Sequence, residues 1–177
     1  SRTSTYGVGQ LIRHAIEQGA RRVVLGPGGS CTNDMGCGCA AALGVVFRDA
    51  QGESFVPVGD TLSEVTSVDV SAAATLLHEV ELTAMCDVQN PLTGPAGAAH
   101  IFAPQKGADA SMVARLDQNA AQLDQLLQAQ HGTTPLAGLA GAGAAGGFGG
   151  GVVALLGGRL QSGIDTVLAT GGFRAQP

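Results

Sequence analysis

The residues best suited to bind an anion lie between positions 26 and 34, where glycines are followed by polar side chains. Gly28 and Gly29 allow the backbone to approach a phosphate or carboxylate without an intervening Cβ atom. Ser30, Thr32 and Asn33 add hydroxyl and amide groups directly after them. Backbone N–H groups in such a turn are a common way to hold an anion. The stretch therefore predicts a binding site for a phosphate or a carboxylate.

Two aspartates are the candidate acidic groups for such a site. Asp87 follows a predicted strand, and Asn90 lies three residues later, directly before Pro91. This pair could ligate Mg²⁺ or orient a substrate hydroxyl, although an aspartate at the end of a strand is also common in Asx turns. Asp34 lies where a helix is expected to begin, so it either caps that helix or also binds a ligand oxygen there.

Lys106 is the single lysine of the chain. A compact ammonium is well suited to a phosphate contact, whereas the alternative is a composition in which arginine and alanine have displaced lysine. A second glycine tract at positions 141–147, which includes Gly141 and Gly143, is open to two readings as well. It is a second anion cradle or a place where two backbones pack closely.

The expected elements alternate between helices and strands, which indicates an α/β protein. We expect helices at 8–16, 34–43, 111–130, 152–156 and 164–169, a buried strand at 22–25, a strand at 79–85, and a hairpin of 45–48 with 53–56. The first of these helices has its apolar residues on one face and ends at Gly19. No internal repeat or linker divides the chain, so we predict one compact lobe with a mixed sheet and surrounding helices.

Composition excludes several classes of function. The net charge is −5 and there is no basic cluster, which argues against a nucleic-acid partner. The segment 132–158 has no charged residue, but its many glycines favour a glycine loop followed by a short buried helix over a membrane span. Polar residues at the start of the chain do not form a signal peptide.

The four cysteines are Cys31, Cys37, Cys39 and Cys86. They form no C-x-x-C pair, so we expect small buried side chains with reduced thiols, in a cytoplasmic protein, rather than a metal site.

The loops taken together resemble the class I glycerate kinases, which phosphorylate glycerate with ATP. The matching blocks, in order, are 28–34, 40–47, 86–92, 104–108 and 141–147, and they span nearly the whole chain. The departures from the family pattern are Pro27, Met35, Cys37, Cys39 and Ala103, none of which removes a polar group.

The resemblance implies a fold and a place within a longer enzyme. Family members are about twice as long, and this chain resembles their middle section. Residues 1–177 would then be the inserted second domain of a two-lobe kinase, and the other lobe, made from the missing N- and C-terminal segments, would be its partner. The active site is expected in the cleft between the lobes.

The resemblance also implies site residues and ligands. The expected reaction is MgATP + D-glycerate → 2-phosphoglycerate + ADP, with ATP and Mg²⁺ required. Lys106 would contact phosphate or carboxylate charge, and Asp87 would be the first candidate for the general base or Mg²⁺ ligand, with Asp34 second. The substrate- or phosphate-binding positions would be Gly28, Gly29, Ser30, Thr32, Asn33, Asn90, Gln105, Gly141 and Gly143. The alternative is an isolated, non-catalytic lobe that binds a small anion or self-associates through the apolar wall its partner would cover.

Overall fold

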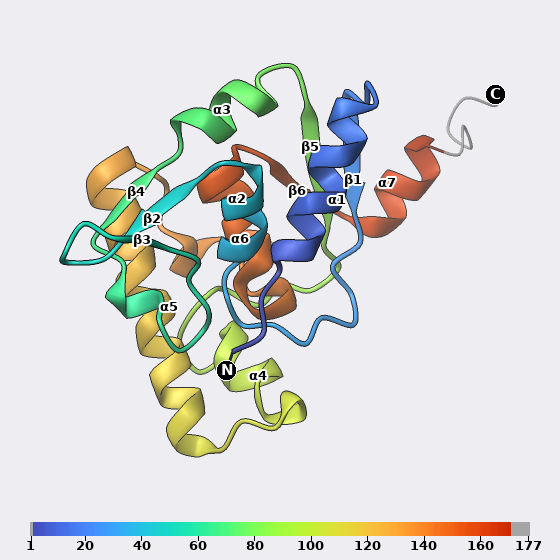
Figure 1. Ribbon diagram of the computed structural model, residues 1–177. Coiled ribbons are helices and arrows are strands. Elements are labelled where there is room, and N and C mark those ends of the chain that lie inside the picture. The colour runs from blue at the N-terminus through green and yellow to red at the C-terminus, as the bar shows by residue number, and fades with distance from the viewer. Residues whose placement is uncertain (1, 171–177) are drawn as a thin grey trace.

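A computed structural model describes residues 2–170 and has an α/β fold with two separate three-stranded sheets (Figure 1). One sheet has the strand order β1-β5-β6 and is parallel; the other has the order β3-β2-β4 and is antiparallel. Figure 1 shows them on opposite sides of the central helices α2 and α6. The prediction of an α/β fold is confirmed, but the prediction of one mixed sheet is wrong.

The parallel sheet consists of β1 (Arg22–Leu25), β5 (Glu81–Met85) and β6 (Arg159–Gln161). The strands predicted at 22–25 and 79–85 are therefore confirmed. β6 was not predicted from the sequence, and it pairs in parallel with the end of β5, where Met85 is aligned with Gln161. All three strands end at the same edge of the sheet, which is where ligand sites form in parallel α/β sheets.

The antiparallel sheet contains the predicted hairpin. β2 (Val46–Arg48) and β3 (Ser54–Phe55) flank the turn, with Arg48 aligned with Ser54. The third strand is β4 (Ser67–Asp69), which pairs with the other edge of β2. The hairpin pairs with this unpredicted strand rather than with β1 or β5, which is why two sheets form instead of one.

Seven α-helices and three 3₁₀ turns are found among the described residues. They are α1 (Tyr6–Glu17), α2 (Cys37–Leu43), α3 (Ser71–Leu77), α4 (Ala98–Phe102), α5 (Ala110–His131), α6 (Ala144–Leu156) and α7 (Gly163–Thr170), with η1 (Leu62–Glu64), η2 (Pro104–Lys106) and η3 (Leu136–Gly138). Within residues 2–170, no helix has the length and apolar character needed to cross a bilayer.

The main hydrophobic core lies between the two sheets and is filled by large side chains with almost no exposed surface. These include Met35, Leu43, Phe47, Leu92, Leu123, Leu127, Leu136 and Val152. A smaller cluster of Ala99, Ala103, Val113 and Leu116 joins α4 to α5. Burial of this apolar area is the main force that holds the loops in place.

Three local predictions need correction. β1 is not fully buried, because it is an edge strand whose residues alternate between exposed and half-buried, and Val24 is 37% exposed. On α1, Leu11 is 72% exposed although it was predicted to belong to the apolar face. α2 begins at Cys37 rather than at Asp34, because Met35 and Gly36 have φ angles of 51° and 74°, which do not fit a right-handed helix.

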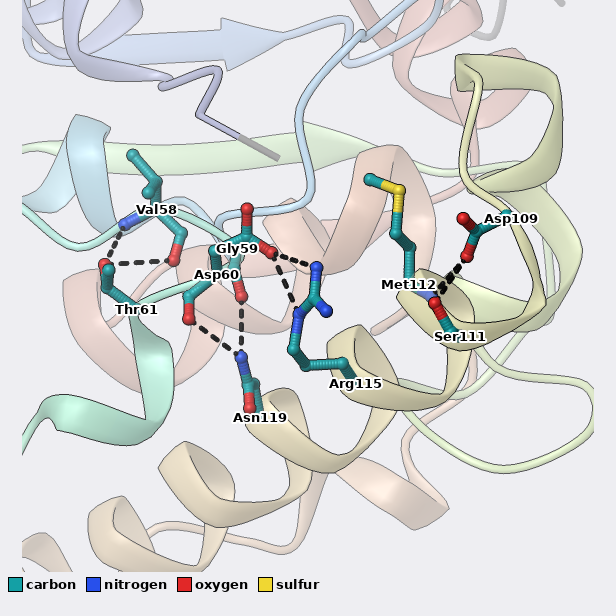
Figure 2. A network of polar contacts seen from close by, with 9 residues as sticks. All are labelled: Val58, Gly59, Asp60, Thr61, Asp109, Ser111, Met112, Arg115 and Asn119. Atoms are coloured by element: carbon teal, nitrogen blue, oxygen red, sulfur yellow. Dashed lines mark hydrogen bonds and ion pairs between the residues drawn. The ribbon is translucent and has the colours of Figure 1, made fainter.

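The long helix α5 fixes the loops of the antiparallel region (Figure 2). Asp109 caps it by accepting a hydrogen bond from the Met112 N–H at 2.8 Å. Asn119 is buried and donates to the carbonyls of Gly59 and Asp60 at 3.0 and 3.2 Å. The helix thus anchors a loop that has no regular structure of its own.

Candidate active site

A cavity of 680 Å³ lies at the edge where the three parallel strands end. Its wall combines the glycine loop after β1, the residues after β5, the start of α7 after β6, the η2 turn and the start of α6. The lining residues are Gly26, Pro27, Gly28, Gly29, Ser30, Met85, Cys86, Asp87, Val88, Phe102, Gln105, Lys106, Ala144, Ala145, Gly163 and Val167. Five of the predicted positions beyond Asp87 therefore meet at one place: Gly28, Gly29, Ser30, Gln105 and Lys106.

The glycine loop presents backbone donors to this cavity. Gly28 and Gly29 are exposed, and Gly29 has a φ of 72°, which a residue with a side chain rarely adopts. Within the part of the chain that is described, the N–H groups of Gly28, Gly29 and Ser30 donate to no other backbone group. Such free, closely spaced donors can bind an anion.

The Ser30 side chain is bonded within the loop. Its Oγ lies 2.8 Å from Thr32 Oγ1 and accepts a hydrogen bond from the Thr32 N–H at 3.2 Å. Thr32 does not line the larger cavity. It lines a second one of 250 Å³, which shares residues 26–30 with the first and is also lined by Ser4, Thr5 and Phe148.

Lys106 supplies the ammonium group of the site. It ends the η2 turn, and its Nζ donates to the Thr32 carbonyl at 2.6 Å. Partial burial lowers the pKa of Lys106 from its usual 10.5, although nearby Cys31 and Asp34 act in the opposite direction. An anion that entered the cavity would favour the charged ammonium and so offset the cost of its partial burial, which makes the group suited to bind one.

Asp87 lines the cavity and is held in place by the start of α7. Its Oδ1 accepts a hydrogen bond from the Gly163 N–H at 2.8 Å, and the Ser162 hydroxyl lies 3.5 Å from the same oxygen. In the structure from residue 2 to 170, Oδ2 has no hydrogen-bond partner. Asp87 therefore has a fixed orientation and one carboxylate oxygen that can accept a proton or ligate a metal.

Asp34 lines neither cavity and is completely buried. Its Oδ2 accepts hydrogen bonds from the N–H and the hydroxyl of Thr5, at 2.7 and 2.9 Å, and from the Gly38 N–H at 3.3 Å. Its Oδ1 accepts from the Gly36 N–H at 3.2 Å. The carboxylate could reach a substrate only if it moved, so its geometry is that of a group that organises the loop before α2.

Two further predicted residues lie outside the cavity wall. Asn33 is buried, and its Oδ1 has no partner within the described region. Asn90 donates through Nδ2 to the Ala96 carbonyl at 2.9 Å, which closes the loop between β5 and α4. Asn90 thus contacts Ala96, whereas Asp87 contacts Gly163, and among the described residues the two side chains do not share a partner.

The second glycine tract is divided between packing and the cavity. The Gly143 N–H donates to the Asn90 carbonyl at 3.0 Å, and a Cβ atom at Gly141 would lie 2.7 Å from Cys86 Sγ. These two glycines line neither cavity. Their geometry corresponds to close backbone packing, the second of the two readings of this tract.

A left-handed turn at residues 145–147 was not foreseen from the sequence. Ala145, Gly146 and Gly147 have φ angles of 53°, 70° and 88°, so the regular part of α6 begins only after them. The Gly146 carbonyl accepts a hydrogen bond from the Met35 N–H at 3.3 Å, and a Cβ atom at Gly146 would overlap the Thr32 carbonyl. The turn thus supports the backbone that Lys106 contacts, and Ala145 itself lines the cavity. In the sequence, the run of consecutive small residues was the one indication of this left-handed turn.

The described residues contain no group of three or more His, Cys, Asp or Glu side chains placed to hold a metal ion. Mg²⁺ in phosphoryl-transfer sites often has one or two protein carboxylates, with phosphate and water as the other ligands. If this chain holds the ion, Asp87 would ligate it through Oδ2, which has no hydrogen-bond partner within residues 2–170; the same oxygen is also the candidate proton acceptor.

The four cysteines are all free, as predicted, but not all are buried. Cys37 and Cys39 are buried in α2, Cys86 is half-buried, and Cys31 is exposed, which corrects the prediction for that residue. Burial, aided by Asp34, raises the pKa of Cys39 to about 12. Cys31 is exposed because it belongs to the loop between the two cavities rather than to the helix.

Comparison with known proteins identifies the family. The chain matches the glycerate kinase family over residues 1–176. It is 45% identical over 166 residues to a glycerate kinase of Bacillus cereus (94% of this chain, 43% of that protein), and 40% identical over 166 residues to the glycerate 2-kinase of Escherichia coli K12 (93% and 43%). The chain thus spans less than half the length of these relatives.

A solved structure has the same fold. It is a crystal structure from Salmonella typhimurium LT2, provisionally titled glycerate kinase 2, with a TM-score of 0.93 and 40% sequence identity. The match covers 98% of this chain and 46% of that one. The match over residues 1–176, together with this shared fold, shows that the chain belongs to the glycerate kinase family.

Proposed function

We propose that this chain forms part of an ATP-dependent glycerate kinase that converts D-glycerate to 2-phosphoglycerate. The observation that carries the proposal is the convergence of sequence blocks that lie far apart in the chain. The glycine loop, Asp87 and Lys106 come from three of the blocks that resemble the family, and all line one cavity at the carboxyl edge of the parallel sheet.

The chemistry of phosphoryl transfer fits what these residues offer. Such a reaction needs positioning of the two substrates and neutralisation of charge on the transferred group more than covalent participation by the protein. The free N–H groups of Gly28 and Gly29 and the ammonium of Lys106 can bind negatively charged oxygens. The free oxygen of Asp87 can accept a proton from a hydroxyl group. When bound, Mg²⁺ would neutralise charge on the phosphates of ATP.

The remaining candidates take supporting roles in this proposal. Asp34 orders the loop that leads into α2, Asn90 closes the loop after β5, and Gly141 and Gly143 allow close packing. Gln105 lines the cavity beside Lys106 and would bind a substrate oxygen. The part of the relatives' length that this chain does not span would be the other lobe and would complete the site, with residues 1–177 as the inserted domain. We place the reaction in the cytoplasm, where ATP is available.

A chimeric enzyme tests the proposal directly. The section of the Escherichia coli glycerate 2-kinase that is 40% identical to this chain is replaced by residues 1–177, and 2-phosphoglycerate formation is measured with D-glycerate and MgATP. We expect activity in the chimera and a severe loss of turnover on Lys106→Ala without loss of the folded state. The matched control is Arg21→Ala, which removes a positive charge from an exposed pair with Glu79 outside the cavity. Normal turnover of the Lys106→Ala chimera would contradict the role of Lys106.

The second candidate function is that of a non-catalytic association module. It is favoured by exposed apolar side chains on two helices, Leu11 on α1 (72% exposed) and Ile164 and Val167 on α7 (63% and 53%). Sedimentation of the chain over a range of concentrations distinguishes the two. Self-association together with an inactive, folded chimera would favour the module.

A further inference from the structure

We infer that the 680 Å³ cavity is the half-site for the hydroxy acid, with the substrate carboxylate on Lys106 and the reacting hydroxyl on Asp87 Oδ2, and that the triphosphate of ATP is bound outside this chain. The inference rests on the proposed function. Of the two roles left open for Lys106, it assigns carboxylate contact rather than phosphate contact. Of the two left open for Asp87, it assigns the general base rather than the Mg²⁺ ligand.

The charges that line the cavity favour a ligand with a single negative charge. Lys106 and Asp87 are the two charged side chains among the described lining residues, so the wall has no net charge. Much of the remaining wall is apolar, with Met85, Phe102 and Val167 among its members. A triphosphate would bring several negative charges next to the Asp87 carboxylate, and one ammonium could not balance them. The resulting repulsion is stronger in a partly buried site than in water. A hydroxycarboxylate needs one cation and one hydrogen-bond acceptor.

Lys106 is fixed where it can bind a carboxylate without leaving its present contact. One of the three donors of its ammonium points to the Thr32 carbonyl at 2.6 Å, which leaves two for a ligand. The Thr32 carbonyl is in turn closely packed against Gly146, where a Cβ atom would overlap it. The position of Nζ is therefore set by the backbone, and so is the position of any carboxylate bound to it.

Asp87 is arranged as a proton acceptor. The Gly163 N–H fixes the carboxylate through Oδ1 at 2.8 Å and leaves Oδ2 without a partner in residues 2–170. A Cβ atom at position 163 would lie 2.6 Å from Oδ2, so the glycine permits this placement. In the reaction, the substrate hydroxyl gives its proton to Oδ2 as its oxygen forms a bond to the γ-phosphorus of ATP. The bond between that phosphorus and the β,γ-bridging oxygen breaks, and its electron pair leaves with ADP.

The first experiment is a calorimetric titration of this chain with D-glycerate, with adenosine and with MgATP. We expect D-glycerate to bind, and glycerol and propionate, which lack the carboxylate and the hydroxyl respectively, to bind at least about tenfold more weakly because each loses a hydrogen-bonded or charged contact. Lys106→Ala should remove D-glycerate binding and Arg21→Ala should not. Adenosine or MgATP binding that depends on Lys106, or no D-glycerate binding by the folded chain, would overturn the inference.

The second experiment uses the chimera and separates this inference from the proposed function. Besides the loss of turnover expected above, Lys106→Ala should raise KM for D-glycerate far more than KM for ATP. Asp87→Asn, which retains the shape of the side chain, should lower kcat by about 10²- to 10⁴-fold, as expected for loss of a general base, with little change in KM for D-glycerate. An unmodified chimera that is folded but inactive contradicts the proposed function. An active chimera in which Lys106→Ala raises KM for ATP instead, or in which Asp87→Asn keeps its kcat, contradicts the inference alone.

Discussion

The buried carboxylate of Asp34 should contribute more to stability than any other single carboxylate among the described residues, because it joins the start of the chain to the loop before α2. Four hydrogen bonds end on it, two from Thr5 and one each from Gly36 and Gly38. Thr5 Oγ1 also accepts from the Cys39 N–H at 2.8 Å, which extends the network into the helix. Asp34→Asn changes this network with almost no change in volume.

The size of the effect follows from the contacts that the amide can keep. An asparagine oxygen can replace Oδ2, but its NH₂ group then faces the Gly36 N–H, and the other three bonds lose the charge on the acceptor. Hydrogen bonds to charged groups contribute about 1.5–3 kcal/mol and neutral ones about 1 kcal/mol. Removing the cost of burying a charge offsets part of this loss, so we expect a net destabilisation of about 3 kcal/mol.

Asp124→Asn is the matched control. Asp124 is also buried, at 4% exposure against 0% for Asp34, but both of its oxygens share a single donor, the Leu136 N–H. An asparagine there keeps one acceptor for that donor, so the expected loss is about 1 kcal/mol. Urea unfolding of the wild type and both variants, with equal slopes, measures the two values.

Equal losses for Asp34→Asn and Asp124→Asn would refute this reasoning, because the number of donors would then not matter. A double-mutant cycle gives an independent check. Thr5→Val removes the shared hydroxyl, so Thr5→Val combined with Asp34→Asn should destabilise the protein by less than the sum of the two single changes.

Three other predictions follow from the site. Ala145→Gly should raise the free energy of unfolding by about 0.5–1 kcal/mol, because relief of a left-handed alanine at φ 53°, about 1–2 kcal/mol, exceeds the entropy cost of a glycine, about 0.5–1 kcal/mol; a loss of stability in urea unfolding would speak against this. Because burial, with a smaller effect of Asp34, raises the pKa of Cys39 to about 12, iodoacetamide at about pH 8 should label exposed Cys31 in the native protein and Cys39 only after unfolding, as read by mass spectrometry. Partial burial lowers the pKa of Lys106 below 10.5, so its positive charge is lost as pH rises through that lower value. D-glycerate binding, followed by calorimetry, should therefore begin to weaken before the rising pH reaches 10.5, and a constant affinity up to that pH would count against the assignment.

Much of the fold could be predicted where the local pattern is long enough. The helix predicted at 111–130 matches α5 to within one residue at each end, and the hairpin predicted from 45–48 and 53–56 matches β2 and β3. β4 and β6 could not be found, because strands of three residues carry too little alternation to differ from a loop. Without them, the division into two sheets was hidden as well.

The site was predictable in its residue types but not in its contacts. Lys106 and Asp87 stood out by rarity and by position, and both line the cavity. The burial of Asp34 depends on Thr5, which lies 29 residues earlier in the chain and shows no pattern that would pair the two. The left-handed geometry of Ala145 depends likewise on the backbone of Met35, since no alanine favours that conformation by itself.

The strand order β1-β5-β6 has a consequence for how the protein folds. The paired strands Arg22–Leu25, Glu81–Met85 and Arg159–Gln161 are separated by long stretches of chain, whereas the hairpin of the other sheet is local. Closing long loops costs entropy before the strands can pair, so non-local pairs form slowly. We therefore expect the hairpin and α5 to gain structure early on the folding pathway. The cavity, which exists only once all three parallel strands are aligned, would then be among the last features to appear, and its assembly would coincide with the rate-limiting step.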